Sequence, residues 1–287
     1  MRSQLVQIWL MAVSLSLALP AVALARNSEV TEQPEEIPAA PGLYGTGPEL
    51  VGPTKYWSVN RAQTLPVGRS LLSTTLLLGA MGVAPFFSRT PGVAIGLFGN
   101  GLNVRADTAI GDRLELGAGI GVLSSLPWRG RLDVSSKWNL AQEGSSGAQL
   151  SISALAGGLA EIDADGLPNF GIQIGLPVTK VFPFNAVNYA ILSMQPTWNI
   201  GIAGISASGA GGPFNYLGLG LGLDLALTDR GHLVADTQFG LKIGGLQTDS
   251  AIGFRYTFSR DMVGDIFLGV GGAGVPFGLG VGGSYRF

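Results

Sequence analysis

The chain has 287 residues, and its 17 basic and 19 acidic side chains nearly balance. This balance argues against a nucleic-acid partner, which would require a basic face. The absence of cysteine excludes disulfide-stabilised domains, thiolate metal sites and cysteine nucleophiles. Charged residues make up only 13% of the chain, and 45 residues are glycine. This is about half the usual charge and about twice the usual glycine of a soluble domain. Strands that hold one face in lipid tolerate both features.

The first 25 residues have the three parts of a cleavable export signal. Arg2 gives a short basic region, residues 8–22 are apolar, and residues 23–25 (Ala-Leu-Ala) match a signal-peptidase site. We therefore predict a signal peptide over residues 1–25. The alternative is an uncleaved membrane anchor, but the apolar stretch is short and no basic stop-transfer cluster follows it.

Residues 26–64 are rich in proline and glutamate. Low hydrophobicity, proline and like charge keep such a segment unpacked. We predict a periplasmic linker here. The alternative is that part of the segment folds into the interior of the domain that follows and plugs it.

Residues 65–287 consist of segments in which apolar residues alternate with small, polar or charged ones. The clearest is 114–122 (LELGAGIGV), where every even position is apolar. The period of two indicates strands with one apolar face. A soluble sandwich has the same period, but segments of roughly 9–13 residues match the length that a tilted strand needs to cross a bilayer. No helical segment interrupts them.

The fold prediction is all-β: a closed antiparallel transmembrane up-and-down β-barrel of about 12 strands, with roughly 10–14 as the range. The expected strands are residues 67–81, 92–109, 114–124, 130–140, 148–158, 169–181, 187–199, 215–227, 232–244, 250–259, 264–271 and 276–287. Polar turns at residues 111–113, 228–231 and 259–261 are assigned to the periplasmic side. A β-bulge is expected near Asn100, where the alternation changes phase. For residues 70–87, a transmembrane helix is the alternative, but a Ser-Thr-Thr run and two glycines disfavour it.

The last strand carries a recognisable signature. Counting back in twos from Phe287 gives Tyr285 and then, except for Gly283, apolar or aromatic residues as far as Phe277. This pattern resembles the terminal strand of bacterial outer-membrane β-barrel proteins. The resemblance implies that Tyr285 and Phe287 are the assembly signal read by the barrel-assembly machinery. It also implies that the protein lies in the outer membrane of a Gram-negative-type bacterium, with the lipid of that membrane as a partner.

The face opposite the apolar one is predicted to line the lumen, because charge is tolerated there only beside water or a partner. The predicted lumen-lining charges are the cations Arg105, Lys137, Lys242, Arg255 and Arg286 and the anions Asp107, Glu115, Asp133, Asp224 and Asp236. The equal numbers predict weak ion selectivity. About 12 strands give a backbone radius of about 12 Å, which leaves room for a narrow aqueous passage.

Aromatic residues at strand ends suit the bilayer interface. We expect an outer girdle of Trp128, Phe214, Tyr216 and Phe277 and a periplasmic girdle of Trp138, Phe182, Phe184, Tyr256, Phe258, Tyr285 and Phe287.

Residues for catalysis or metal binding are sparse. His232 is the only histidine and is expected to be isolated at the periplasmic rim, so a hydrolase would lack its cluster. Residues 161–166 loosely resemble a calcium loop without its later ligands. No cofactor, metal or catalytic site is predicted. The leading hypothesis is a channel or transporter for small solutes. A non-conducting structural or adhesive barrel is second, and a barrel-type hydrolase is third.

Overall fold

A computed structural model describes much of the predicted barrel and a short segment before it. The described residues are 56–57, 59–79, 101–123, 129–143, 150–162, 168–184, 188–202, 213–242, 245–259, 261–271 and 277–287. They all belong to one compact unit, Ile37–Phe287. The predicted signal peptide, most of the predicted linker, the expected bulge near Asn100 and residues 163–166 of the calcium-like loop lie outside them.

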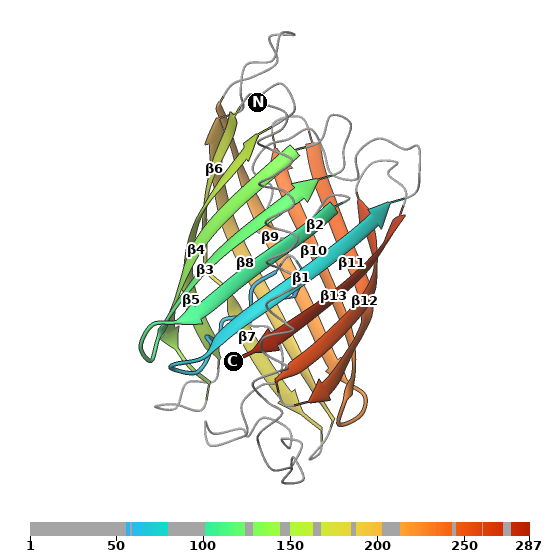
Figure 1. Ribbon diagram of the computed structural model, residues 1–287. Coiled ribbons are helices and arrows are strands. Elements are labelled where there is room, and N and C mark those ends of the chain that lie inside the picture. Colours follow the sequence, from blue (N-terminus) through green and yellow to red (C-terminus); the bar gives the residue numbers. More distant parts are fainter. Residues whose placement is uncertain are drawn as a thin grey trace. The chain divides into compact units, whose positions relative to one another are not determined.

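Thirteen strand segments form one antiparallel sheet. They are β1 (Ser70–Gly79), β2 (Gly101–Ala109), β3 (Leu114–Leu123), β4 (Arg129–Ala141), β5 (Ser151–Ile162), β6 (Pro168–Gly175), β7 (Val178–Pro183), β8 (Tyr189–Ile202), β9 (Pro213–Ala226), β10 (Gly231–Lys242), β11 (Gly245–Ser259), β12 (Met262–Gly271) and β13 (Phe277–Arg286). Because β1 pairs with β13, the sheet closes into a barrel (Figure 1).

Segments β6 and β7 are two parts of one barrel strand. Both pair with β5 on one side and β8 on the other, and the register is the same before and after the interruption. The ladder breaks at Leu176-Pro177 because proline has no N–H to donate. The barrel therefore has 12 strands, which confirms the predicted fold class and strand count.

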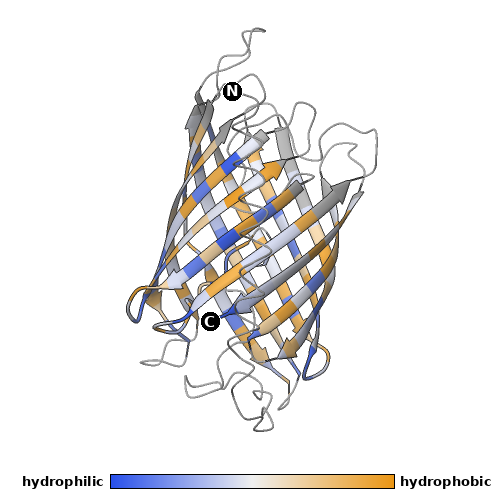
Figure 2. Cartoon of the chain, in the orientation of Figure 1, coloured by the Kyte–Doolittle hydropathy of each residue, from blue (hydrophilic) through white to orange (hydrophobic). Residues whose placement is uncertain are grey.

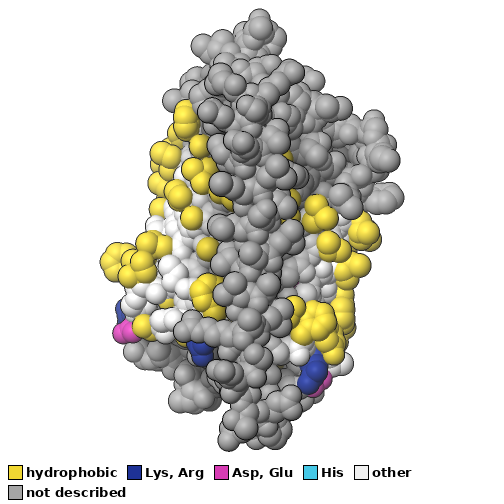
Figure 3. Space-filling model, in the orientation of Figure 1, with side chains coloured by type: hydrophobic (Ala, Val, Ile, Leu, Met, Phe, Trp, Pro, Cys, Tyr) yellow, Lys and Arg dark blue, Asp and Glu magenta, His cyan; other side chains and the backbone are white. Residues whose placement is uncertain are grey.

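The two faces of the barrel wall differ in polarity, as the period of two predicts. On β3, Ile120 is 47% exposed, whereas Glu115 is only 6% exposed. Figure 2 shows the same alternation of hydrophobic and hydrophilic residues along the strands. In Figure 3, hydrophobic side chains spread over the barrel wall, and the charged side chains in view lie near its lower end. The outward face is thus suited to lipid.

The seam between the first and last strands is complete. Ser70 N donates to Phe287 O at 2.8 Å, and Phe287 N donates to Ser70 O at 2.9 Å. The register then runs without a shift from Leu71 opposite Arg286 to Gly79 opposite Gly278. An unpaired backbone group in hydrocarbon costs several kcal/mol, so closure is what allows the sheet to span a membrane.

Phe287 lies at the end of the barrel that also carries the short turns after β2 and β9 (Figure 1). We call this the turn end. Gly111 has a φ of 75°, a conformation that glycine adopts without steric cost, in the turn between β2 and β3. Exposed aromatic side chains at this end include Trp138, Phe182 and Phe258. The outer-girdle side chains of the prediction lie outside the described side chains.

Among the described residues, no helix is long and apolar enough to cross a membrane. The helical alternative for residues 70–87 is wrong for residues 70–79, which form β1.

The lipid-facing assignment predicts a depth-dependent penalty for charge. Ile266 lies in the middle of β12 and its side chain is exposed, so Ile266→Arg should destabilise the folded barrel by about 2–4 kcal/mol in lipid vesicles. The matched control is Gly269→Arg on the same strand, because Gly269 is inward and an added Cβ meets no atom closer than 4.0 Å. Chemical unfolding measures both. Equal losses would contradict the assigned faces.

Candidate functional site: the barrel interior

Part of the predicted linker lies inside the barrel. We call residues 56–57 and 59–65 the inner segment. A tight turn joins it to β1: Arg69 N donates to Pro66 O at 3.0 Å, and Gly68 has a φ of 75°, as a type II turn requires. Leu65 packs against Leu71 and Ala109 at the turn end. The chain thus reverses from the interior into the wall.

Backbone N–H groups of the inner segment donate to side chains of the wall. The bonds are Val59 N to Asp236 Oδ2 (3.3 Å), Asn60 N to Gln195 Oε1 (2.6 Å), Ala62 N to Thr179 Oγ1 (2.9 Å) and Leu65 N to Glu115 Oε2 (2.8 Å). In the other direction, Asn139 Nδ2 donates to Ala62 O at 3.1 Å. A segment without regular secondary structure needs such partners, because its buried backbone groups would otherwise be unsatisfied.

The inner segment also has an apolar seat. Trp57 stacks on Phe267 of β12 with ring centroids 4.5 Å apart, and both belong to one buried cluster with Tyr56 and Val59. Inward glycines make room for these side chains. A Cβ at Gly220 would lie 2.8 Å from Val59 Cγ2, and one at Gly222 would overlap the Tyr56 ring. The glycines on the inner face of β9 therefore form the seat.

Three basic side chains converge on one buried carboxylate, Asp224 of β9. Arg61 of the inner segment pairs with Oδ2, and His232 Nδ1 lies 2.8 Å from Oδ1. Arg255 Nη1 lies 3.8 Å from Oδ2, and Arg255 is held by Asp265 through Nε–Oδ1 (2.7 Å) and Nη2–Oδ2 (3.0 Å). The Tyr56 ring lies 4.8 Å from Arg61 Cζ. We call Asp224, Arg61, His232, Arg255 and Asp265 the Asp224 cluster.

A second charged cluster lies on the opposite part of the wall, on β2 and β4. Arg105 donates through Nε to Asp107 at 2.8 Å and also pairs with Asp133 and Ser135. Glycines again provide the space, since a Cβ at Gly117 would overlap the Arg105 guanidinium. Nearby, Lys137 Nζ lies 3.0 Å from Glu115 Oε1. These pairs satisfy charges that would be costly to bury alone.

Of the ten predicted lumen-lining charges, nine have described side chains, and all nine are buried, at 2–6% exposure. They fall into the two clusters, the Lys137–Glu115 pair, Asp236 beside the inner segment, and Arg286, whose Nε lies 3.0 Å from Asp261 Oδ1 at the turn end. The side chain of Lys242 lies outside the described side chains.

The expectation that His232 is isolated at the rim was wrong. Its side chain is buried, bonded to Asp224, and in edge contact with the Tyr189 ring at 5.8 Å. His232 is the second residue of β10 and lies next to the turn, as expected. It pairs with Ala226 of β9, and the side chain of Asp224, two residues earlier on β9, bonds to its ring. Proximity to a turn did not imply exposure, because the side chain of His232 points inward and is covered by Asp224 and Tyr189.

Six further inward polar residues were not among the predicted ones. They are Arg61, Arg131, Gln173, Gln195, Asn199 and Asp265. Extending the period of two would have found Arg131, two residues before Asp133. It would also have found Gln195 and Asn199, which alternate with the exposed Met194 and Trp198. No pattern marks Arg61, because it lies outside the strands.

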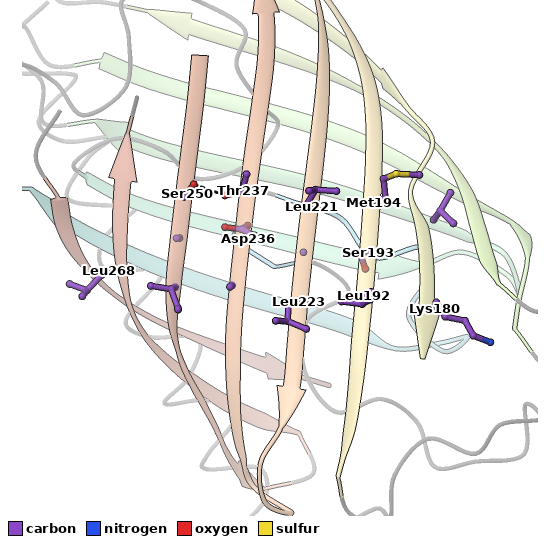
Figure 4. Close-up of a pocket in the computed structure, with 15 residues that line it drawn as sticks. Lys180, Leu192, Ser193, Met194, Leu221, Leu223, Asp236, Thr237, Ser250 and Leu268 are labelled. Carbon is purple, nitrogen blue, oxygen red and sulfur yellow. Dashed lines mark hydrogen bonds between the residues drawn. The ribbon is translucent and has the colours of Figure 1, made fainter. Parts of the chain in front are cut away.

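A hollow of about 680 Å³ lies along β7 to β12 and is lined mainly by apolar side chains (Figure 4). Leu192, Met194 and Leu221 of its lining are exposed on the outward face. Thr237 and Ser250, which share a hydrogen bond, are small side chains between the larger ones. The hollow therefore belongs to the lipid-facing surface and not to the interior. Among the described residues, no group of three or more His, Cys, Asp or Glu could hold a metal ion.

The chain is similar in structure to several solved outer-membrane proteins. The COG4313 outer membrane channel from Pseudomonas putida F1 has a TM-score of 0.52 and 13% identity, over 79% of this chain and 98% of that one. The translocator domain of autotransporter NalP from Neisseria meningitidis scores 0.49 at 15% identity (79% and 91%), and the KdgM porin 0.48 at 9% (76% and 99%). No family model and no curated protein matches the chain. The chain shares the β-barrel fold of the COG4313 outer membrane channel.

The glycine seat predicts that a single added methyl group loosens the inner segment. Gly222→Ala should place a Cβ inside the Tyr56 ring, and such overpacking costs about 1–3 kcal/mol. In detergent micelles, trypsin should then cleave faster after Arg61, whose side chain is buried in the parent protein. Gly269→Ala, with an open space for the new methyl group, should cleave at the parent rate. Identical rates in both variants would contradict the seat.

Proposed function

We propose that the protein is an outer-membrane channel that passes small solutes through the barrel lumen. The observation that carries this proposal is the difference in polarity between the inner and outer faces of the barrel wall. Charged and amide side chains are buried inside a closed barrel whose outward face is apolar. A barrel that served only as an anchor would not need buried charges, which are costly unless paired or hydrated. The fold shared with the COG4313 outer membrane channel is consistent with this role.

We further propose that the interior is hydrated. Several buried side-chain atoms on the wall make no hydrogen bond to protein, among them Asp107 Oδ2 and Gln173 Oε1. Buried polar atoms are usually satisfied, and ordered water is the usual partner where protein groups are absent. Water around these groups would line a polar path for a solute.

The inner segment acts in this proposal as a plug, the second of the two expectations for residues 26–64. It contacts the wall on β3, β4, β7, β8, β9, β10 and β12, so it crosses much of the interior. With the plug seated, Arg61 adds a cation next to Asp224, and cations and anions pair within the two clusters. A lumen with balanced charge should discriminate only weakly between small anions and cations.

Catalysis is not part of the proposal. His232 has Asp224 as a partner but no described nucleophile is bonded to it, so the residues of a hydrolytic relay are not assembled there. A non-conducting structural or adhesive barrel is the alternative, and no described residue favours it.

A disulfide lock tests the plug and the channel together. Since the chain has no cysteine, Val59→Cys with Gly220→Cys introduces only one pair, and the short distance between these side-chain positions suits a disulfide. Oxidised protein in planar bilayers should open rarely, and reduction should restore the conductance steps of the parent. The single variant Val59→Cys is the control, because it cannot form the bridge.

Two outcomes of the lock experiment would contradict the proposal separately. Equal conductance before and after reduction would mean that solutes pass without displacing the inner segment, so it would not be a plug. Silence of the parent and of the reduced protein would contradict the channel.

We also propose that the C-terminal strand is the signal that the barrel-assembly machinery, a separate partner, recognises. Phe287 bonds to Ser70 through backbone atoms only, while its ring is exposed. Phe287→Ala should therefore refold normally in detergent but assemble more slowly through the reconstituted machinery. Phe258→Ala, which removes an exposed ring from β11, should assemble at the parent rate. Equal slowing in both variants would contradict a signal specific to the last strand.

A further inference from the structure

Of the three basic side chains around Asp224, only Arg255 makes no hydrogen bond to it. Arg61 and His232 occupy the two oxygens of Asp224. Arg255 is anchored to Asp265 through Nε and Nη2, which leaves Nη1 buried, without a hydrogen bond, and 3.8 Å from the same Oδ2 atom that Arg61 holds. An arginine fork fixed at two of its nitrogens presents the third in a defined direction. Here that direction is toward Asp224.

The two arginines belong to different parts of the protein, the inner segment and the barrel wall. Arg61 lies on the inner segment, whereas Arg255 lies on β11 of the wall, with Asp265 beside it on β12. Displacement of the inner segment removes Arg61 from Asp224. A buried carboxylate that loses its partner is strongly destabilised unless another donor replaces the lost one. Arg255 needs to move by only about 1 Å to bring Nη1 from 3.8 Å to hydrogen-bond distance.

We propose that Asp224 exchanges partners, from Arg61 when the inner segment is seated to Arg255 when it leaves. The exchange lowers the free energy of the open lumen without weakening the closed one, because Arg255 makes no hydrogen bond to Asp224 while Arg61 is present. The exchange allows the inner segment to leave and return, because Asp224 is paired with an arginine both when the segment is seated and when it is displaced. The proposal rests on the proposed function only in that the displaced segment opens the channel.

The exchange predicts opposite effects for the two arginines, which a merely structural role does not. Arg61→Ala removes the partner used in the closed state, so the inner segment should leave more often. Arg255→Lys keeps a cation beside Asp265 but replaces the planar fork by a single nitrogen, so it cannot keep two bonds to Asp265 and direct a separate nitrogen toward Asp224. The open state then loses its replacement donor, and the inner segment should leave less often.

The test reads displacement directly and does not depend on conductance. In the full chain, Val59→Cys provides a single cysteine at a position that is buried in the parent protein. The rate at which a small methanethiosulfonate reagent modifies it in folded, detergent-solubilised protein reports how often the inner segment leaves. In this background, Arg61→Ala should raise the rate by about tenfold or more, and Arg255→Lys should lower it by about threefold to tenfold.

Two controls sharpen the result. Arg105→Lys changes an arginine that is similarly buried and whose hydrogen-bond partners Asp107, Asp133 and Ser135 all lie on the wall, so it should leave the rate unchanged. With Asp224→Asn, the carboxylate that both arginines serve is gone, and Arg255→Lys should no longer slow modification. Unboiled samples that migrate differently from boiled ones establish that each variant is folded.

Several outcomes would overturn the exchange. Faster modification in both Arg61→Ala and Arg255→Lys would mean that the two arginines only stabilise the packing. An unchanged rate with Arg255→Lys would mean that Arg255 does not serve the open state. No modification even with Arg61→Ala would mean that the segment does not leave. If the rates shift as expected while bilayers stay silent, the exchange stands and the channel function fails.

Discussion

The structure depends on one constraint: in hydrocarbon, every backbone N–H and C=O must find a partner within the protein. Closure between β1 and β13 meets it, down to the paired bonds of Ser70 and Phe287. Pro177 interrupts the ladder of backbone hydrogen bonds only locally, because the register with β5 and with β8 is the same before and after it. Once the sheet is closed, alternation along each strand sends one set of side chains to lipid and the other to the interior.

The interior satisfies its polar groups by a different route. Its charges pair across strands, and inward glycines leave space that is filled by Arg105 in one region and by the inner segment in another. The inner segment has no ladder of its own, so wall side chains such as Asp236 and Gln195 accept from its backbone. The barrel wall and the inner segment are therefore complementary in shape and in hydrogen bonding, and the Asp224 cluster joins them electrostatically.

The sequence was sufficient for the fold because period-two alternation is a local signal repeated in every strand. It predicted all 12 barrel strands, including the one that Pro177 interrupts. The alternation signal is weaker in strands whose inward side chains are also apolar. Leu71 and Ile191 face inward, against Leu65 and Ala226 respectively, so the alternation of apolar and polar residues is weak in their strands. Contacts of the inner segment, such as Arg61 with Asp224 across 163 positions, follow from tertiary packing and leave no periodic trace.

The specific bonds that hold the inner segment in the lumen are tested most directly by hydrogen exchange of individual backbone amides in micelles. The amides of Asn60, Ala62 and Leu65, which donate to wall side chains, should exchange well below the rates of an unfolded peptide, yet faster than the seam amides of β1 and β13. Exchange of these three amides at unfolded rates, with the strands protected, would contradict the account.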